Sequence, residues 1–126
     1  MDKGLCRTNN GNSGDAWIIT GSPQSVYDEE DWMLRLEVNI RDGAKCKRPI
    51  LGICFGHQLI AKSFGGTVEK NPNGWELGSY SISLTEHGKY SPLFQGMEDE
   101  LIVYESHQDS VIVLPDGAVE LAYNQK

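Results

Sequence analysis

The sequence predicts an α/β fold, because two short apolar runs typical of buried strands are each followed by a helical segment. The first run, residues 16–20, stops at the Gly-Ser-Pro turn of residues 21–23. Residues 32–42 then alternate as a strand would, but they also place their apolar side chains on one helix face. Acidic residues ahead of this segment and Gly43 after it favour a helix that stops at the glycine.

The second strand–helix pair begins with the apolar run of residues 48–54. A helix is expected over residues 56–64, with Gly65 and Gly66 as its stop. Strand, helix, strand and helix in this order imply parallel strands joined by right-handed crossovers.

The second half of the chain changes to short alternating runs separated by turns. The expected strands are residues 67–69, 79–84, 101–104, 111–114 and 119–123, with turns at 71–74 and 115–117. We expect an irregular lead-in over residues 1–14 and a single domain over residues 15–126.

Composition narrows the function classes. The 126 residues are 39% hydrophobic and carry a net charge of −7, which fits a domain with its own core and disfavours a nucleic-acid partner. No apolar stretch is long enough to cross a membrane, and residues 1–16 contain no apolar block of the kind expected in a secretory signal. Three cysteines without metal spacing predict free thiols in the cytoplasm, with no metal and no cofactor.

The segment Gly52-Ile53-Cys54-Phe55-Gly56 lies where the second strand meets its helix. A nucleophile on such a sharp turn projects above the strand end, and flanking glycines let neighbouring backbone approach it. The helix N-terminus favours the thiolate, the Phe55 N–H can face an oxyanion, and the turn at residues 20–23 can supply a second donor. The alternative interpretation is a small buried cysteine packed against the sheet. The strand before it, the helix after it and the glycine turn favour a reactive site.

Four segments resemble class I (triad) glutamine amidotransferases, close to stand-alone guanylate-synthase-like members. They are residues 49–61 around the cysteine, residues 18–28 after the first strand, Gly74-Trp75-Glu76-Leu77-Gly78 and Ser106-His107-Gln108-Asp109. They occur in the family's order over residues 15–124. The resemblance implies a flavodoxin-like three-layer α/β fold.

Carried over by position, the resemblance implies that Cys54 attacks the side-chain amide of glutamine, or of a γ-glutamyl compound, and releases ammonia. Family members often pass the ammonia to a synthase partner. The other implied site residues are Gly21, Ser22 and Phe55 for the oxyanion hole, and Gln58, Ser106 and His107 for the amino-acid end of the substrate.

The 126 residues contain no Gln-Phe-His-Pro-Glu type segment, which in the family supplies the general base and its glutamate. His57, on the helix after the cysteine, and His87 are expected to be surface or packing residues. We therefore expect a central portion of the family fold, truncated at both ends, with impaired activity. Unpaired strand edges predict a homo-oligomer. The alternative function is a catalytically inactive oligomeric binding protein with a vestigial site.

Overall fold

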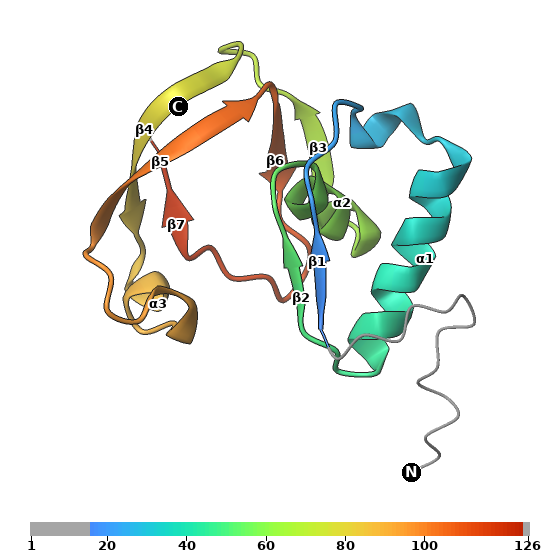
Figure 1. Ribbon diagram of the computed structural model, residues 1–126, viewed down its shortest axis with the longest axis horizontal. Helices are drawn as coiled ribbons and strands as arrows, with labels where there is room; N and C mark the ends of the chain where they lie inside the picture. Colours follow the sequence, from blue (N-terminus) through green and yellow to red (C-terminus); the bar gives the residue numbers. More distant parts are fainter. Residues whose placement is uncertain (1–15, 125–126) are drawn as a thin grey trace. The chain divides into compact units, whose positions relative to one another are not determined.

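The computed structural model describes residues 16–124, which divide into two compact units (Figure 1). The first unit contains residues 16–69 and 109–116, and the second contains residues 70–108 and 117–124. The lead-in predicted for residues 1–14 lies outside the described residues, as does Cys6. The single domain expected over residues 15–126 stays a prediction.

The first unit is built on a parallel strand pair, as the sequence predicts. Strand β1 (Trp17–Ile19) pairs with β2 (Ile50–Gly52), with Trp17 opposite Ile50 and Ile19 opposite Gly52. Helix α1 (Asp31–Lys45) connects them, and α2 (Phe55–Ser63) begins two residues after the end of β2. The predicted strand–helix order is confirmed.

The predicted stop of the first helix at Gly43 is wrong, because α1 continues to Lys45. Gly43 is buried within the helix, and a Cβ atom added to it would lie 2.5 Å from a ring atom of Trp17. The glycine therefore admits the indole of β1 against the helix. None of the helices among residues 16–124 is both long and apolar enough to cross a membrane.

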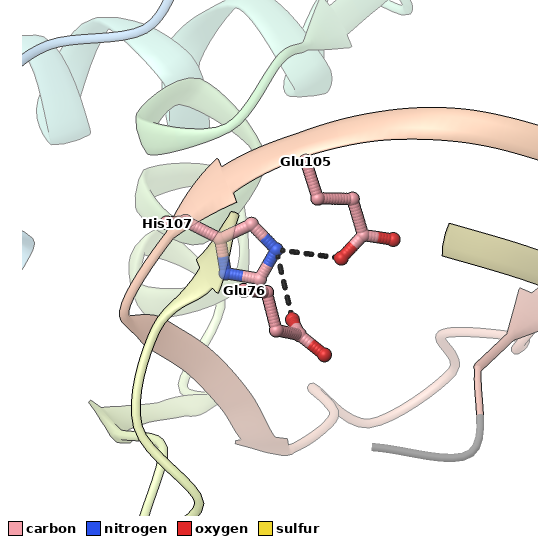
Figure 2. A group of neighbouring side chains, drawn as sticks. All are labelled: Glu76, Glu105 and His107. Carbon is pink, nitrogen blue, oxygen red and sulfur yellow. Dashed lines mark hydrogen bonds and ion pairs between the residues drawn. The ribbon is translucent and has the colours of Figure 1, made fainter. Parts of the chain in front are cut away.

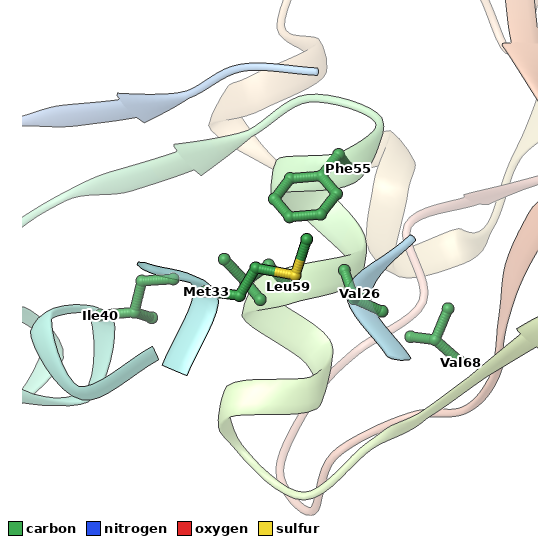
Figure 3. Close-up of a cluster of buried hydrophobic side chains, with 6 residues drawn as sticks. All are labelled: Val26, Met33, Ile40, Phe55, Leu59 and Val68. Carbon is green, nitrogen blue, oxygen red and sulfur yellow. The ribbon is translucent and has the colours of Figure 1, made fainter. Parts of the chain in front are cut away.

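The core of the first unit lies between its two helices and one face of the parallel strands (Figure 3). Ile19 and Ile50 of the strands pack against this core. Its buried members are Val26, Met33, Ile40, Phe55, Leu59 and Val68. The N-terminal turn of α2 is therefore anchored by its own first residue, Phe55, whose ring lies 5.6 Å from that of Trp32.

The opposite face of the parallel pair is exposed, so the two apolar runs form strands that are buried on one face only. Ile18 is 66% exposed, Leu51 45% and Ile53 52%. Apolar residues on both faces of a strand are what a sheet covered on both sides requires. In the described part of the chain, the helices cover only one face.

Two further strands complete the sheet structure of the first unit. β3 (Thr67–Lys70) pairs with β6 (Asp109–Val113), and α2 packs against β6. A residue far along the sequence, Asp109, is thereby brought to the elements that surround Cys54.

The second unit is an antiparallel sheet with strand order β5-β4-β7. Its strands are β4 (Glu76–Leu84), β5 (Glu100–His107) and β7 (Ala122–Tyr123). The short helix α3 (Glu86–Lys89) contains His87, which is exposed. The strand predicted at residues 119–123 is shorter than expected, because only its last two residues before Asn124 pair with β4.

Candidate active site

Cys54 is the second of the two residues, Ile53 and Cys54, between the end of β2 and the start of α2. The N–H of Ile53 still donates to the Ile19 carbonyl at 2.9 Å, while the N–H of Gly56 already donates to the Ile53 carbonyl at 2.9 Å. The chain therefore changes from strand to helix across Cys54, which adopts φ 54° and ψ −112°. Such a backbone conformation costs a non-glycine residue about 1–3 kcal/mol, and it is typical of functional sites.

The two glycines that flank Cys54 are required by close backbone approach. A Cβ atom at Gly56 would lie 2.0 Å from the Ile19 carbonyl oxygen. A Cβ atom at Gly52 would lie 2.6 Å from the backbone of Gly56 and His57. The first turn of α2 is thus pressed onto the ends of both strands. This contact explains the glycine spacing around the cysteine.

The loop after β1 comes next to the cysteine. A Cβ atom on Gly21 would lie 3.7 Å from the Cβ of Cys54, an ordinary contact distance. The Ser22 hydroxyl donates to Oε1 of Gln24 at 2.6 Å and accepts from the Gln24 N–H at 3.3 Å. The structure therefore brings together Cys54 and the turn that the sequence analysis selected.

Two further residues of α2 were expected at the site, Phe55 and Gln58. The Phe55 side chain is buried in the core, so only its backbone is available for an oxyanion. The Gln58 side chain is buried, and its Nε2 donates to the Asp109 carbonyl at 3.1 Å. Gln58 thus links α2 to β6.

The Asp109 carboxylate binds the segment that follows the Gly21 loop. It accepts hydrogen bonds from the Ser25 hydroxyl at 2.7 Å and from the Tyr27 hydroxyl at 2.9 Å. Tyr27 lies in the short 3₁₀ helix η2 (Val26–Asp28). The sequence analysis named Asp109 only as part of a segment that resembles the family, and it did not anticipate this role in holding the loop. No local pattern links residues more than 80 positions apart.

Ser106 and His107 belong to the second unit, at the end of β5. The Ser106 side chain is on the exposed face of the strand. His107 is half-buried, with Nε2 3.0 Å from Oε2 of Glu76 and 3.1 Å from Oε2 of Glu105. Burial, and then the neighbouring Glu76 carboxylate, raise the pKa of Glu105 above its ordinary value.

The sequence analysis did not anticipate these two carboxylates. Alternation along β5 could have placed Glu105 on the face of His107. Glu76 could be found only from the register, in which it lies directly opposite His107.

The predicted site residues are therefore distributed over both units. The first unit holds Gly21, Ser22, Cys54, Phe55 and Gln58, and the second holds Ser106 and His107. Their catalytic and binding roles remain predictions.

The parallel strand pair and its strand-to-helix turn define an α/β protein with a cysteine on a nucleophile-elbow geometry. Residues 6–126 match the family described as Glutamine amidotransferase class-I. The chain belongs to the class I glutamine amidotransferase family, as the resemblance implied.

Named relatives and a solved structure agree with this assignment. The chain is 32% identical over 114 residues to gamma-glutamyl peptidase 5 of Arabidopsis thaliana, covering 89% of this chain and 45% of that protein. It is 41% identical over 100 residues to the glutamine-hydrolyzing GMP synthase of Finegoldia magna, covering 79% of this chain and 18% of that protein.

The crystal structure of a glutamine amidotransferase from Methylobacillus flagellatus superposes with a TM-score of 0.77 at 31% identity. The match covers 88% of this chain and 43% of that one. The class I amidotransferase fold is therefore shown, and the chain spans less than half the length of each of these three proteins.

Proposed function

We propose that the chain carries the nucleophile portion of a cysteine-dependent amide hydrolysis site for glutamine. The observation that supports this most directly is Cys54 in a strained backbone conformation at the N-terminus of α2, with Gly21 beside it. A γ-glutamyl compound is the alternative substrate, because one relative is named a gamma-glutamyl peptidase.

The reaction begins with attack of the Cys54 sulfur on the side-chain amide carbon. The negative charge moves to the amide oxygen, where backbone N–H groups of Phe55 and the Gly21–Ser22 turn stabilise it. The carbon–nitrogen bond then breaks, and the nitrogen takes up the proton that the thiol gave up and leaves as ammonia. The acyl group stays on the Cys54 sulfur as a glutamyl thioester. Water then hydrolyses the thioester, releasing glutamate and regenerating the thiol. Gln58, Ser106 and His107 are the proposed contacts to the amino-acid end.

We propose slow turnover for the 126-residue chain on its own. A general base typically contributes about 10²–10⁴ in rate, and the segment that supplies it in the family is not among these residues. The helix N-terminus still favours the thiolate of Cys54, so the thiol keeps reactivity toward electrophiles.

The test compares the wild-type chain with Cys54→Ala and Cys46→Ala. Cys46 is a matched control, because it is also a half-buried cysteine that forms no disulfide. By mass spectrometry, we expect one adduct of a glutamine-mimicking electrophile on Cys54 in wild type and in Cys46→Ala. The Cys54→Ala variant should lack this adduct. Ammonia release from glutamine should exceed the Cys54→Ala background. Equal background and no labelling of Cys54 would reject the enzymatic function.

The second candidate function is an oligomeric binding protein with a vestigial site. The exposed apolar face of Ile18, Leu51 and Ile53 favours it, because such surfaces favour association. A homo-oligomer is the proposed state, and a synthase is the proposed partner because one relative is a GMP synthase. Sedimentation should give a mass above that of the monomer. A monomer at micromolar concentration would contradict self-association.

A further inference from the structure

Three chemistry-bearing side chains of the second unit converge on one face of its sheet (Figure 2). Glu76 on β4 lies directly opposite His107 on β5, and Glu105 precedes His107 by two residues on the same strand. Residues two apart on a strand point to the same face of the sheet, so Glu105 and His107 share a face. Glu76 lies on this face too, because it is directly opposite His107 in the pairing of β4 with β5. One ligand atom from each of the three lies within 4.8 Å of the others.

The distances are close to those of ligands around one metal ion. His107 Nε2 lies 3.0 Å from Glu76 Oε2 and 3.1 Å from Glu105 Oε2. In a tetrahedral site with bonds of about 2.0 Å, neighbouring ligand atoms lie about 3.3 Å apart. Only small side-chain adjustments would therefore bring the three atoms around one ion.

The charge of the cluster also favours a cation. The Glu76 side chain is 4% exposed and that of Glu105 is 14% exposed. Within residues 16–124, no lysine or arginine forms an ion pair with either carboxylate. A protonated His107 offsets only one of the two negative charges, whereas a divalent ion beside a neutral imidazole offsets both. Two poorly solvated carboxylates this close to each other are otherwise costly.

The surroundings supply a fourth ligand and space. The Asn124 side-chain amide lies 2.9 Å from Glu76 Oε1 and 3.3 Å from Glu105 Oε2. Rotating this amide by half a turn would present its oxygen to the same point. The residue opposite Glu105 is Gly78, and a Cβ atom there would meet no atom within 4 Å. No cross-strand side chain therefore fills the position facing Glu105.

We propose that Glu76, Glu105, His107 and Asn124 form a binding site for a divalent transition-metal ion of the zinc class. One imidazole with two carboxylates suits zinc, whereas magnesium and calcium prefer oxygen ligands alone. The site lies wholly within the second unit. It uses His107, which is also one of the proposed glutamine contacts, but metal binding there does not require the reaction proposed for Cys54.

The experiment titrates metal-free protein with Zn²⁺ and Mg²⁺ by calorimetry, and records the melting temperature with each ion. We expect saturable binding of one Zn²⁺ at this site, a higher melting temperature with Zn²⁺, and no response to Mg²⁺. Glu105→Gln keeps the shape of the side chain, and should weaken zinc binding at the site at least about tenfold. Glu100→Gln on the same strand is the matched control and should bind like wild type, because Glu100 is exposed and lies outside the cluster.

Absorption spectra of the cobalt-loaded protein distinguish this site from a metal bound to cysteine thiols. The cysteines are unchanged in every variant of this experiment. We expect a nitrogen–oxygen spectrum without thiolate charge-transfer bands, lost in Glu105→Gln and in a second variant, His107→Gln. Circular dichroism checks that both variants fold. The proposal is overturned by absence of saturable zinc binding, by unchanged affinity in both variants, by thiolate bands, or by equal binding of Mg²⁺.

Discussion

Replacing Gly56 by alanine tests the close contact that holds Cys54 on its turn. The new Cβ would lie 2.0 Å from the Ile19 carbonyl oxygen and 2.7 Å from its carbon. Both are backbone atoms of β1, so no side-chain rotation relieves the overlap, and the helix must move away from the strand. Overpacking of this kind costs up to about 3 kcal/mol. Alanine's higher helix propensity returns about 1 kcal/mol.

The net expectation is a loss of about 2 kcal/mol, which for a small protein lowers the urea midpoint by about 1 M. Unfolding followed by tryptophan fluorescence reports on the first unit through Trp17 and Trp32, in a background where Trp75 of the second unit is replaced by phenylalanine. Gly21→Ala is the matched control, because its Cβ meets only Cys54 at 3.7 Å. A Gly56→Ala midpoint within about 0.3 M of the Gly21→Ala midpoint would refute the steric explanation of the glycine spacing.

Three further predictions follow from packing and charge. Met33→Ala leaves a cavity beneath the helices and should destabilise the chain by about 2–5 kcal/mol in urea unfolding; a loss below about 1 kcal/mol would contradict full burial. Asp109→Asn weakens the acceptor shared by Ser25 and Tyr27, so amide exchange in residues 22–28 should accelerate, whereas unchanged exchange would show that other contacts hold this loop. The pKa of Glu105 is raised in the folded state, so protonated Glu105 contributes to the free energy of unfolding. This contribution is fully present below the unfolded pKa of about 4.3, and it is lost as the pH rises through the folded pKa. As the pH rises from the unfolded to the folded pKa, metal-free wild type should therefore lose stability relative to Glu105→Gln. A stability difference between the two proteins that does not change with pH would contradict the raised pKa.

The sequence by itself determined the local elements of the first unit and the position of its cysteine. Two apolar runs followed by helical segments were enough to predict parallel strands, because period and turn residues are local signals. The glycines around Cys54 predicted a tight turn, and a Cβ at either flanking position would strike backbone.

Long-range contacts were decided only by the tertiary structure. Gly43 looked like a helix stop, but the helix continues because the glycine makes room for the ring of Trp17. Asp109 meets Ser25 and Tyr27 only because β6 pairs with β3 and packs on α2. Such pairings depend on which surfaces remain to be buried once the local elements have formed, and periodicity carries no information about them.

The same reason explains the cluster in the second unit. Alternation along β5 places Glu105 and His107 on one face, but the sequence does not specify the strand opposite them. The register of β4 and β5 brings Glu76 across from His107, and β7 brings Asn124 to the same point. Cross-strand neighbours are fixed by hydrogen-bond register, which only the folded sheet defines.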